Sequence, residues 1–208
     1  MDKNLEENMA DSTLSCADLT DLNALVRDFF RNNDLYLDIP IDIVALVKKL
    51  GFKVLAMDLG IIEDGIDGLI LVDESSKKIG PFETNKLIIY DRALKNIPET
   101  RFVIAHELAH YIHQKRVGRN VVFGEKVRHG SGKDKSKCED EVRFKIEQKM
   151  DYMAAVILVP GESLKNKLKN LNYNSLDELN KGIVIGDLAN EYAVSSELMK
   201  RRIEEVSC

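Results

Sequence analysis

The stretch FVIAHELAHYIHQ, residues 102–114, holds three of the four histidines in this chain of 208 residues. Its apolar residues recur at helical spacing, and they are Phe102, Ala105, Leu108, Ala109 and Ile112. This pattern predicts an amphipathic helix from Pro98 to about Arg116 with one buried stripe. His106 and His110 are four residues apart, about 40° around the helix axis, so both side chains can reach one ion.

A glutamate, Glu107, follows the first of these histidines and completes the spacing HExxH. Two histidines at this spacing can bind zinc, and a carboxylate beside them can take a proton from water. The pattern therefore predicts a catalytic metal site, against the alternative of surface histidines on an amphipathic helix. His113 stands seven residues after His106, about 10 Å further along the axis, and is expected outside the site.

A third ligand has to come from elsewhere, and a second predicted helix over 139–159 offers candidates. Glu147 and Asp151 share one face of it at i and i+4, so one can bind the metal while the other accepts a ligating histidine's distal N–H. Two alternatives remain: Asp151 is the ligand, or both acids lie on a solvated face. Asp140 and Glu141 are read as acids at the helix start. The residues expected on its buried side are Ile146, Met150, Met153, Ala154 and Ile157.

The remaining chain predicts helices around a small sheet. Two helices are expected over 18–32 and 39–51, and a long surface loop over 117–137. Short branched-aliphatic runs predict three or four strands. These runs are FKVLAMDL (52–59), GLILVD (68–73) and KLIIYD (86–91). The last of them could be an edge that pairs with an extended substrate, or a core strand. The C-terminal tail predicts short helices, with a turn at 193–195 between the last two.

Composition and charge exclude several classes of protein. The formal net charge is −5, which argues against nucleic-acid binding as the main role. An acidic, polar N-terminus and the lack of any long apolar run predict a cytoplasmic protein that does not enter a membrane. Cys16, Cys138 and Cys208 are widely spaced, so we expect free thiols and no cysteine zinc site.

Several stretches together resemble the ImmA/IrrE family of metallo-endopeptidases. In chain order they are IPIDIVALVKKLGFKVLAMDL, GIDGLILVD, TRFVIAHELAHYIHQ, EQKMDYMAAVILVP and IGDLANEYAVSSELMKRRI. The resemblance implies an α+β, zincin-like fold in which a small sheet packs on the HExxH helix. It implies a catalytic domain over 1–165 and a small helical segment over 166–208 that could dock substrate. Members of the family cut helix-turn-helix repressors and so derepress mobile-element, phage or stress genes.

The same resemblance implies the roles of individual residues. In the family's second motif the ligand glutamate precedes an aspartate or asparagine by four positions, which here are Glu147 and Asp151. One zinc ion, or manganese, would then be bound by His106, His110 and Glu147, with Glu107 as the catalytic acid and base. The chain departs from the pattern at Lys149 and Met150, where the family often has another acid and an alanine. The oxyanion donor is open among Tyr90, His129 and Tyr152.

Two other classes of function remain as alternatives. The helix-turn-helix-like tail and a basic loop would suit a regulator that binds DNA. The loop's basic residues are Lys126, Arg128, Lys133, Lys135 and Lys137. Acids in the last helix, Glu197, Glu204 and Glu205, favour a protein partner over direct nucleic-acid binding. In the other alternative the metal only stabilises the fold of a silent zincin.

Overall fold

The computed structural model describes residues 14–35, 38–61, 65–117, 123–124 and 137–207. Within them the order of elements confirms an α+β fold in which a small sheet packs on the HExxH helix. The elements are α1 (Cys16–Asn32), α2 (Ile43–Lys49), β1 (Lys53–Met57), β2 (Gly68–Val72), β3 (Lys86–Asp91), α3 (Ile97–Val117), β4 (Phe123–Gly124), α4 (Lys137–Leu158), α5 (Gly161–Asn170), the 3-10 helix η1 (Tyr173–Ser175), α6 (Glu178–Tyr192) and α7 (Ser196–Ser207).

The four strands of the described sheet follow the order β1-β3-β2-β4. β1 runs parallel to β3, whereas β2 is antiparallel to both β3 and β4. The strand KLIIYD is therefore interior, and the expectation that it could be an edge is wrong. The physical reason is visible in the sequence, because Leu87, Ile88 and Ile89 are all buried. A continuous apolar run of this kind suits a strand covered on both faces.

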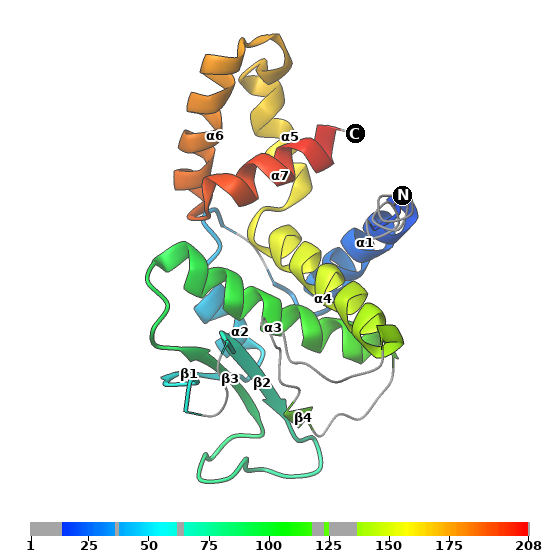
Figure 1. Ribbon diagram of the computed structural model, residues 1–208, viewed down its shortest axis with the longest axis vertical. Helices are drawn as coiled ribbons and strands as arrows, with labels where there is room; N and C mark the ends of the chain where they lie inside the picture. Colours follow the sequence, from blue (N-terminus) through cyan, green and yellow to red (C-terminus); the bar gives the residue numbers. More distant parts are fainter. Residues whose placement is uncertain (1–13, 36–37, 62–64, 118–122, 125–136, 208) are drawn as a thin grey trace, which may run out of the picture.

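The two faces of the sheet pack against different neighbours. Ile70, Val72 and Ile88 point to the main core, to which α3 contributes Ile104 and Leu108. On the other face Leu59, Ile66, Leu87 and Ile89 form a smaller cluster. Figure 1 shows α3 lying across the sheet. The HExxH helix is thus held by the sheet on one side, and other helices, α1, α2 and α4, pack against the rest of its surface.

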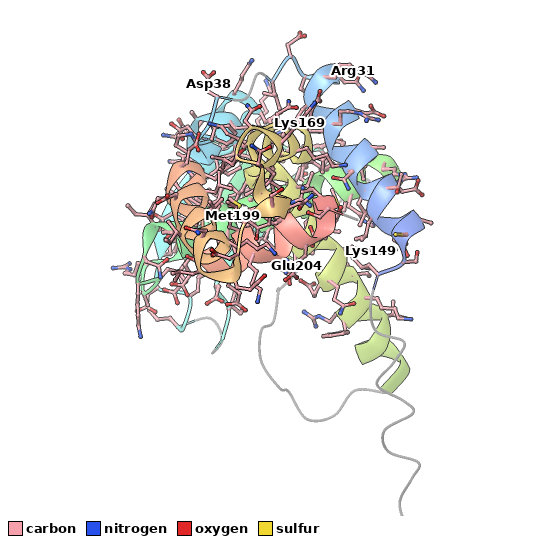
Figure 2. All side chains as sticks on the ribbon, turned by 90° about the horizontal axis from the view of Figure 1, so that it is seen from above. Arg31, Asp38, Lys149, Lys169, Met199 and Glu204 are labelled. Carbon is pink, nitrogen blue, oxygen red and sulfur yellow. The ribbon has the colours of Figure 1, made fainter. Side chains whose placement is uncertain are left out.

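One of these helices is α4, which packs beside α3 (Figure 1). Met150, Met153 and Ala154 are completely buried, as the helical periodicity predicts. Ile146 is 39% exposed, so its expected place on the buried side is wrong. The first turns of α4 extend past the packed core, as Figure 2 shows, and only the later turns are enclosed. The part of α4 that packs in the core therefore begins at about Glu147, the candidate ligand.

The C-terminal helices pack on the same core. The predicted turn between the last two helices is confirmed, with Ala193 in the left-handed conformation at a φ of 52°. Arg101 of α3 donates from Nε to the carbonyl oxygen of Ala193 at 2.9 Å. The buried cluster includes Leu22 near one end of the chain and Ile203 near the other. The expected boundary between a catalytic domain (1–165) and a C-terminal segment (166–208) falls within α5. Both segments contribute to the same buried cluster, so the boundary would divide functional roles and not separate cores.

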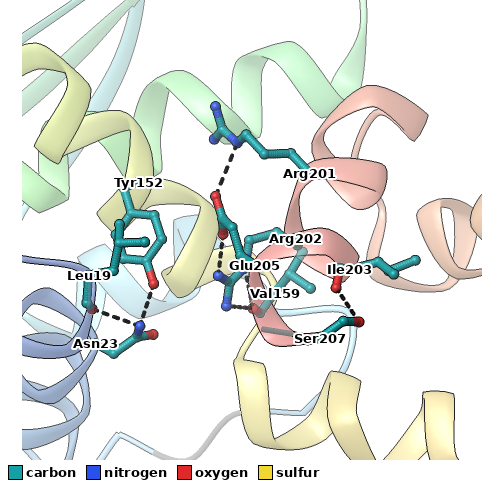
Figure 3. Close-up of polar contacts among 9 residues, drawn as sticks. All are labelled: Leu19, Asn23, Tyr152, Val159, Arg201, Arg202, Ile203, Glu205 and Ser207. Atoms are coloured by element: carbon teal, nitrogen blue, oxygen red, sulfur yellow. Dashed lines mark hydrogen bonds and ion pairs between the residues drawn. The ribbon is translucent and has the colours of Figure 1, made fainter. Parts of the chain in front are cut away.

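A buried arginine joins α7 to the end of α4. Arg202 is 1% exposed, and its guanidinium donates to the carbonyl oxygen of Val159 at 3.1 and 3.3 Å (Figure 3). Its Nη1 also pairs with Glu205 Oε2 at 2.6 Å. Each of the three guanidinium nitrogens of this buried charge donates a hydrogen bond, and breaking these bonds is costly, so α7 is held firmly against the core. None of the helices in the described ranges has the length and apolarity that a membrane span requires.

Candidate metal centre

Two helices bring three candidate ligands together. α3 supplies His106 and His110, and α4 supplies Glu147. The two histidine Nε2 atoms lie 3.2 Å apart. Oε2 of Glu147 lies 3.1 Å from Nε2 of His106 and 3.7 Å from Nε2 of His110. The three donor atoms therefore form a compact triangle.

The triangle has the dimensions that a metal ion requires. A tetrahedral zinc ion binds nitrogen and oxygen at about 2.0 to 2.1 Å, which places neighbouring ligand atoms about 3.3 Å apart. The three observed separations, 3.1, 3.2 and 3.7 Å, bracket that value. Both histidines are buried, and all three residues could hold one ion. Two imidazoles and one carboxylate also form a donor set that leaves a position open for chemistry.

Asp151 lies one turn beyond Glu147 and contacts the other side of the first histidine. Its Oδ1 accepts the Nδ1–H of His106 at 2.8 Å. With the proton held on Nδ1, the lone pair of a neutral ring is on Nε2 and points at the other two candidate ligands. Of the two acids on this face of α4, the structure thus brings Glu147 to the donor triangle and Asp151 behind the imidazole.

Charge interactions within this group shift its ionisation strongly. Burial of the His106 ring lowers its pKa, but the hydrogen bonds to Asp151 and Glu147 outweigh burial and raise the pKa to about 10. Burial raises the pKa of Glu147, and its contacts with His106 and His110 overcome this and hold the pKa well below its usual range. Without metal, the two groups therefore form a buried ion pair.

Glu107 lies beside the triangle and is 1% exposed. It follows His106 on α3, and its carboxylate packs against the first residue of β2, Gly68. Its negative charge adds to those that raise the pKa of His106. Glu107 directly follows the candidate ligand His106 in the sequence. Strand β2 packs against its carboxylate and restricts the side-chain conformations that are open to it.

The two tyrosines proposed as oxyanion donors lie in different places relative to the donor triangle. Tyr152 faces away from the triangle, because its hydroxyl accepts from Asn23 of α1 and its ring lies under Arg202 (Figure 3). Tyr90 lies on β3 opposite Gly68 and packs against the main core. Cross-strand partners share a face of the sheet, so Tyr90 is on the side of α3. His129 lies outside the described residues.

Comparison with models of known protein families shows the family to which the chain belongs. The peptidase M78 family model, described as an IrrE N-terminal-like domain, matches residues 47–204. The chain belongs to this family. Comparison with curated proteins gives no match. Membership of a peptidase family, together with the buried His-His-Glu group, supports a metal-dependent peptidase that acts on protein.

The departures from the family pattern have structural roles in this M78 peptidase. Nζ of Lys149 pairs with Asp18 of α1 at 3.1 Å. Met150 is completely buried in the main core. Neither side chain competes with Glu147, because one joins α4 to α1 and the other fills the interior. His113 is not among the residues that could hold the metal. The side chains of Asp140 and Glu141, and the basic loop from Lys126 to Lys135, lie outside the description.

Two features of the site did not emerge from sequence reasoning. Gly68 contacts both Glu107 and Val103, which a close reading could have suspected because a glycine begins an otherwise aliphatic strand. A cavity of about 650 Å³ also opens next to Asp151, between α3, α4 and α7. Its lining includes Phe102, Glu197, Lys200 and Arg201. Nothing in the local sequence pattern indicates that α7 would reach this place.

Metal binding by the M78 peptidase is expected to release a proton at neutral pH. His106 must be neutral to act as a ligand, yet its pKa of about 10 keeps it protonated in the metal-free protein. We expect release of about one proton per metal near pH 8, and an affinity that rises about tenfold per pH unit. Calorimetry in two buffers of different ionisation enthalpy measures the proton. Release near zero would contradict the ion-pair description.

The same shifts set the pH dependence of stability for the metal-free protein. A folded pKa of about 10, above the ordinary 6.5, gives His106 a contribution that is full below pH 6.5 and lost as the pH rises through 10. The lowered pKa of Glu147 gives a contribution that is present above its ordinary 4.5 and lost in acid. Both contributions are therefore complete between about pH 4.5 and 6.5.

Asp151→Asn is expected to weaken the site without removing it. The amide can still accept from Nδ1 of His106, but it lacks the charge that orients and polarises the ring. We expect a loss of about 10- to 100-fold in metal affinity or activity, less than the loss on changing Glu147. Metal titration of both variants gives the order. If Asp151→Asn is the more damaging change, the two acids have been assigned the wrong way round.

Proposed function

We propose that this M78 peptidase is a zinc-dependent endopeptidase of the cytoplasm that cleaves a helix-turn-helix transcriptional repressor, with manganese as an alternative metal. One observation supports the catalytic part most directly. A buried donor triangle of His106, His110 and Glu147 lies beside a buried carboxylate, Glu107. That combination is what hydrolysis of a peptide bond needs: a Lewis acid and a base at one place.

The chain's own residues supply the other parts of the reaction. A divalent metal at the triangle would polarise the scissile carbonyl and make a water molecule more acidic. Glu107 takes the proton from the attacking water and later delivers it to the leaving amine nitrogen. Asp151 keeps the His106 ring in place by accepting its Nδ1–H. Tyr90, on the face of the sheet nearest α3, is the described candidate for stabilising the developing negative charge.

An extended substrate would pair with β2 in this proposal. β3 has neighbours on both sides, but the β4 side of β2 is paired only at Leu71 and Val72 among the described residues. The first part of that edge, from Gly68 to Ile70, begins beside Glu107. Backbone hydrogen bonds along such an edge bind a peptide in extended form with little regard to its sequence.

Recognition of the folded repressor is assigned to the C-terminal segment, residues 166–208. The cavity next to Asp151 carries acids and bases of α7 together, among them Glu197, Lys200 and Arg201. Interspersed charges of both signs suit a protein partner better than a row of phosphates. The cavity also reaches Phe102, whose ring lies 6.4 Å from that of His106, so a partner held there is close to the site.

If a small helix-turn-helix repressor is encoded beside this gene, the test is its cleavage by the purified, zinc-loaded chain. We expect one or a few defined fragments, loss of cleavage with a chelator, and recovery on adding zinc. An intact repressor, together with binding of DNA that weakens steeply with salt, would favour the DNA-binding regulator. An intact repressor with unfolding on chelation would favour a structural metal.

A further inference from the structure

The first residue of β2, Gly68, has no room for a side chain. A Cβ built on Gly68 would lie 2.6 Å from Cγ1 of Val103 and 2.7 Å from Oε1 of Glu107. It would also lie 3.2 Å from Cγ of Glu107. These contacts are far inside ordinary van der Waals distance, so a methyl group could enter only if α3 side chains moved.

The lack of space around position 68, and not its backbone conformation, explains why a glycine stands there. The described glycines with positive φ are Gly51, Gly65 and Gly80, and Gly68 is not among them. Its backbone is ordinary strand that other residues adopt freely. A glycine within a strand lowers the stability of the protein, because it has no side chain to pack and its backbone is flexible in the unfolded chain. The glycine at this position therefore marks a close approach between strand and helix.

The alternation along β2 shows where the missing side chain would point. Ile70 and Val72 share a face with Gly68 and enter the main core with Ile104 and Leu108 of α3. Gly68 is thus the one place on this face where the strand leaves a hollow. Glu107 fills it, which explains how a charged side chain that is 1% exposed fits between a helix and a sheet.

We propose that Gly68 is a positioning residue for the proposed reaction: it reserves the space that holds the carboxylate of Glu107 beside the donor triangle. The inference rests on the proposed function only in assigning Glu107 the proton transfer. The two collisions differ in consequence. Val103 is β-branched and stiff at χ1, whereas the unbranched side chain of Glu107 has three rotatable bonds, so its carboxylate gives way first. A methyl group at position 68 therefore displaces the base from its working position.

Gly68→Ala is expected to lower kcat by about 100-fold, because small displacements of a reacting group cost that much. KM and the metal content should change less than kcat, since the substitution removes no metal ligand and no backbone hydrogen-bonding group of β2. Gly68→Ala/Val103→Ala removes the stiff collision and should recover the melting temperature but not kcat. Gly60→Ala is the matched control, because among the described residues a Cβ there meets only Oδ1 of Asp58, at an ordinary 3.5 Å. It should cleave as the wild type does.

A double-mutant cycle tests the same contact without activity. Gly68→Ala should destabilise the metal-loaded protein less when Glu107 is already alanine, because the displaced carboxylate is gone. If wild-type protein cleaves no repressor but the coupling is present, the proposed function fails and the packing inference stands. Equal destabilisation in both backgrounds, or normal kcat in Gly68→Ala, would overturn the inference. Recovery of kcat in the Val103 double variant would also overturn it, since the effect would then be structural.

Discussion

Glu107→Gln is expected to remove the proposed repressor cleavage while leaving the metal and the fold in place. Glutamine has almost the same shape, so it fits the space beside Gly68 and keeps the packing between α3 and β2. It cannot accept a proton from water, so the rate should fall by about 100- to 10,000-fold. Single-turnover cleavage of the repressor, with metal content measured on the same sample, gives the result.

The matched control for this change is Glu83→Gln, a carboxylate in the segment between β2 and β3. The Glu83 side chain is 87% exposed and lies outside the cavity next to Asp151, so its loss should not affect the proton transfer. Near-normal cleavage by Glu107→Gln would exclude Glu107 as the base. A loss of metal in that variant would instead mean that Glu107 helps to hold the ion, and the assignment of roles within HExxH would need revision.

Loss of a ligand should have the other large effect. His110→Ala and Glu147→Ala each remove one corner of a triangle whose sides are 3.1, 3.2 and 3.7 Å. Two remaining ligands cannot hold zinc in competition with buffer, so metal content should fall from about one equivalent to almost none, and cleavage with it. Elemental analysis after dialysis measures the content.

His113→Ala is the control for the ligand variants, because it removes a histidine from the same helix outside the metal group. It should keep a full equivalent of metal. Circular dichroism separates ligation from folding, since Glu147→Ala also removes the carboxylate that contacts Nε2 of the buried His106. A folded Glu147→Ala protein that retains all its metal would show that the ligand set is wrong.

The local parts of the site were determined by the sequence alone. Helix pitch places residues four apart on one face, so His106 and His110 had to converge once their segment became helical. The same rule gave Glu147 and Asp151 a common face on α4, and one now lies at the donor triangle while the other accepts from His106. Apolar periodicity also located α3 and α4 closely, because both helices are buried along one stripe.

Other features depended on how elements far apart in the chain pack together. Whether KLIIYD is an edge or an interior strand depends on its partners, and β1 and β2 occupy both of its sides. Tyr152 follows Asp151 in sequence, yet the helix turns it toward Asn23 and Arg202 and away from the metal group.

Gly68 and the α7 side of the cavity are likewise tertiary features, because they follow from the distance between a helix and a strand and from where α7 packs. Helical geometry is repeated at every turn and can be read from spacing. The separation of packed elements is set by the sum of many side-chain volumes, and no short stretch of sequence contains it.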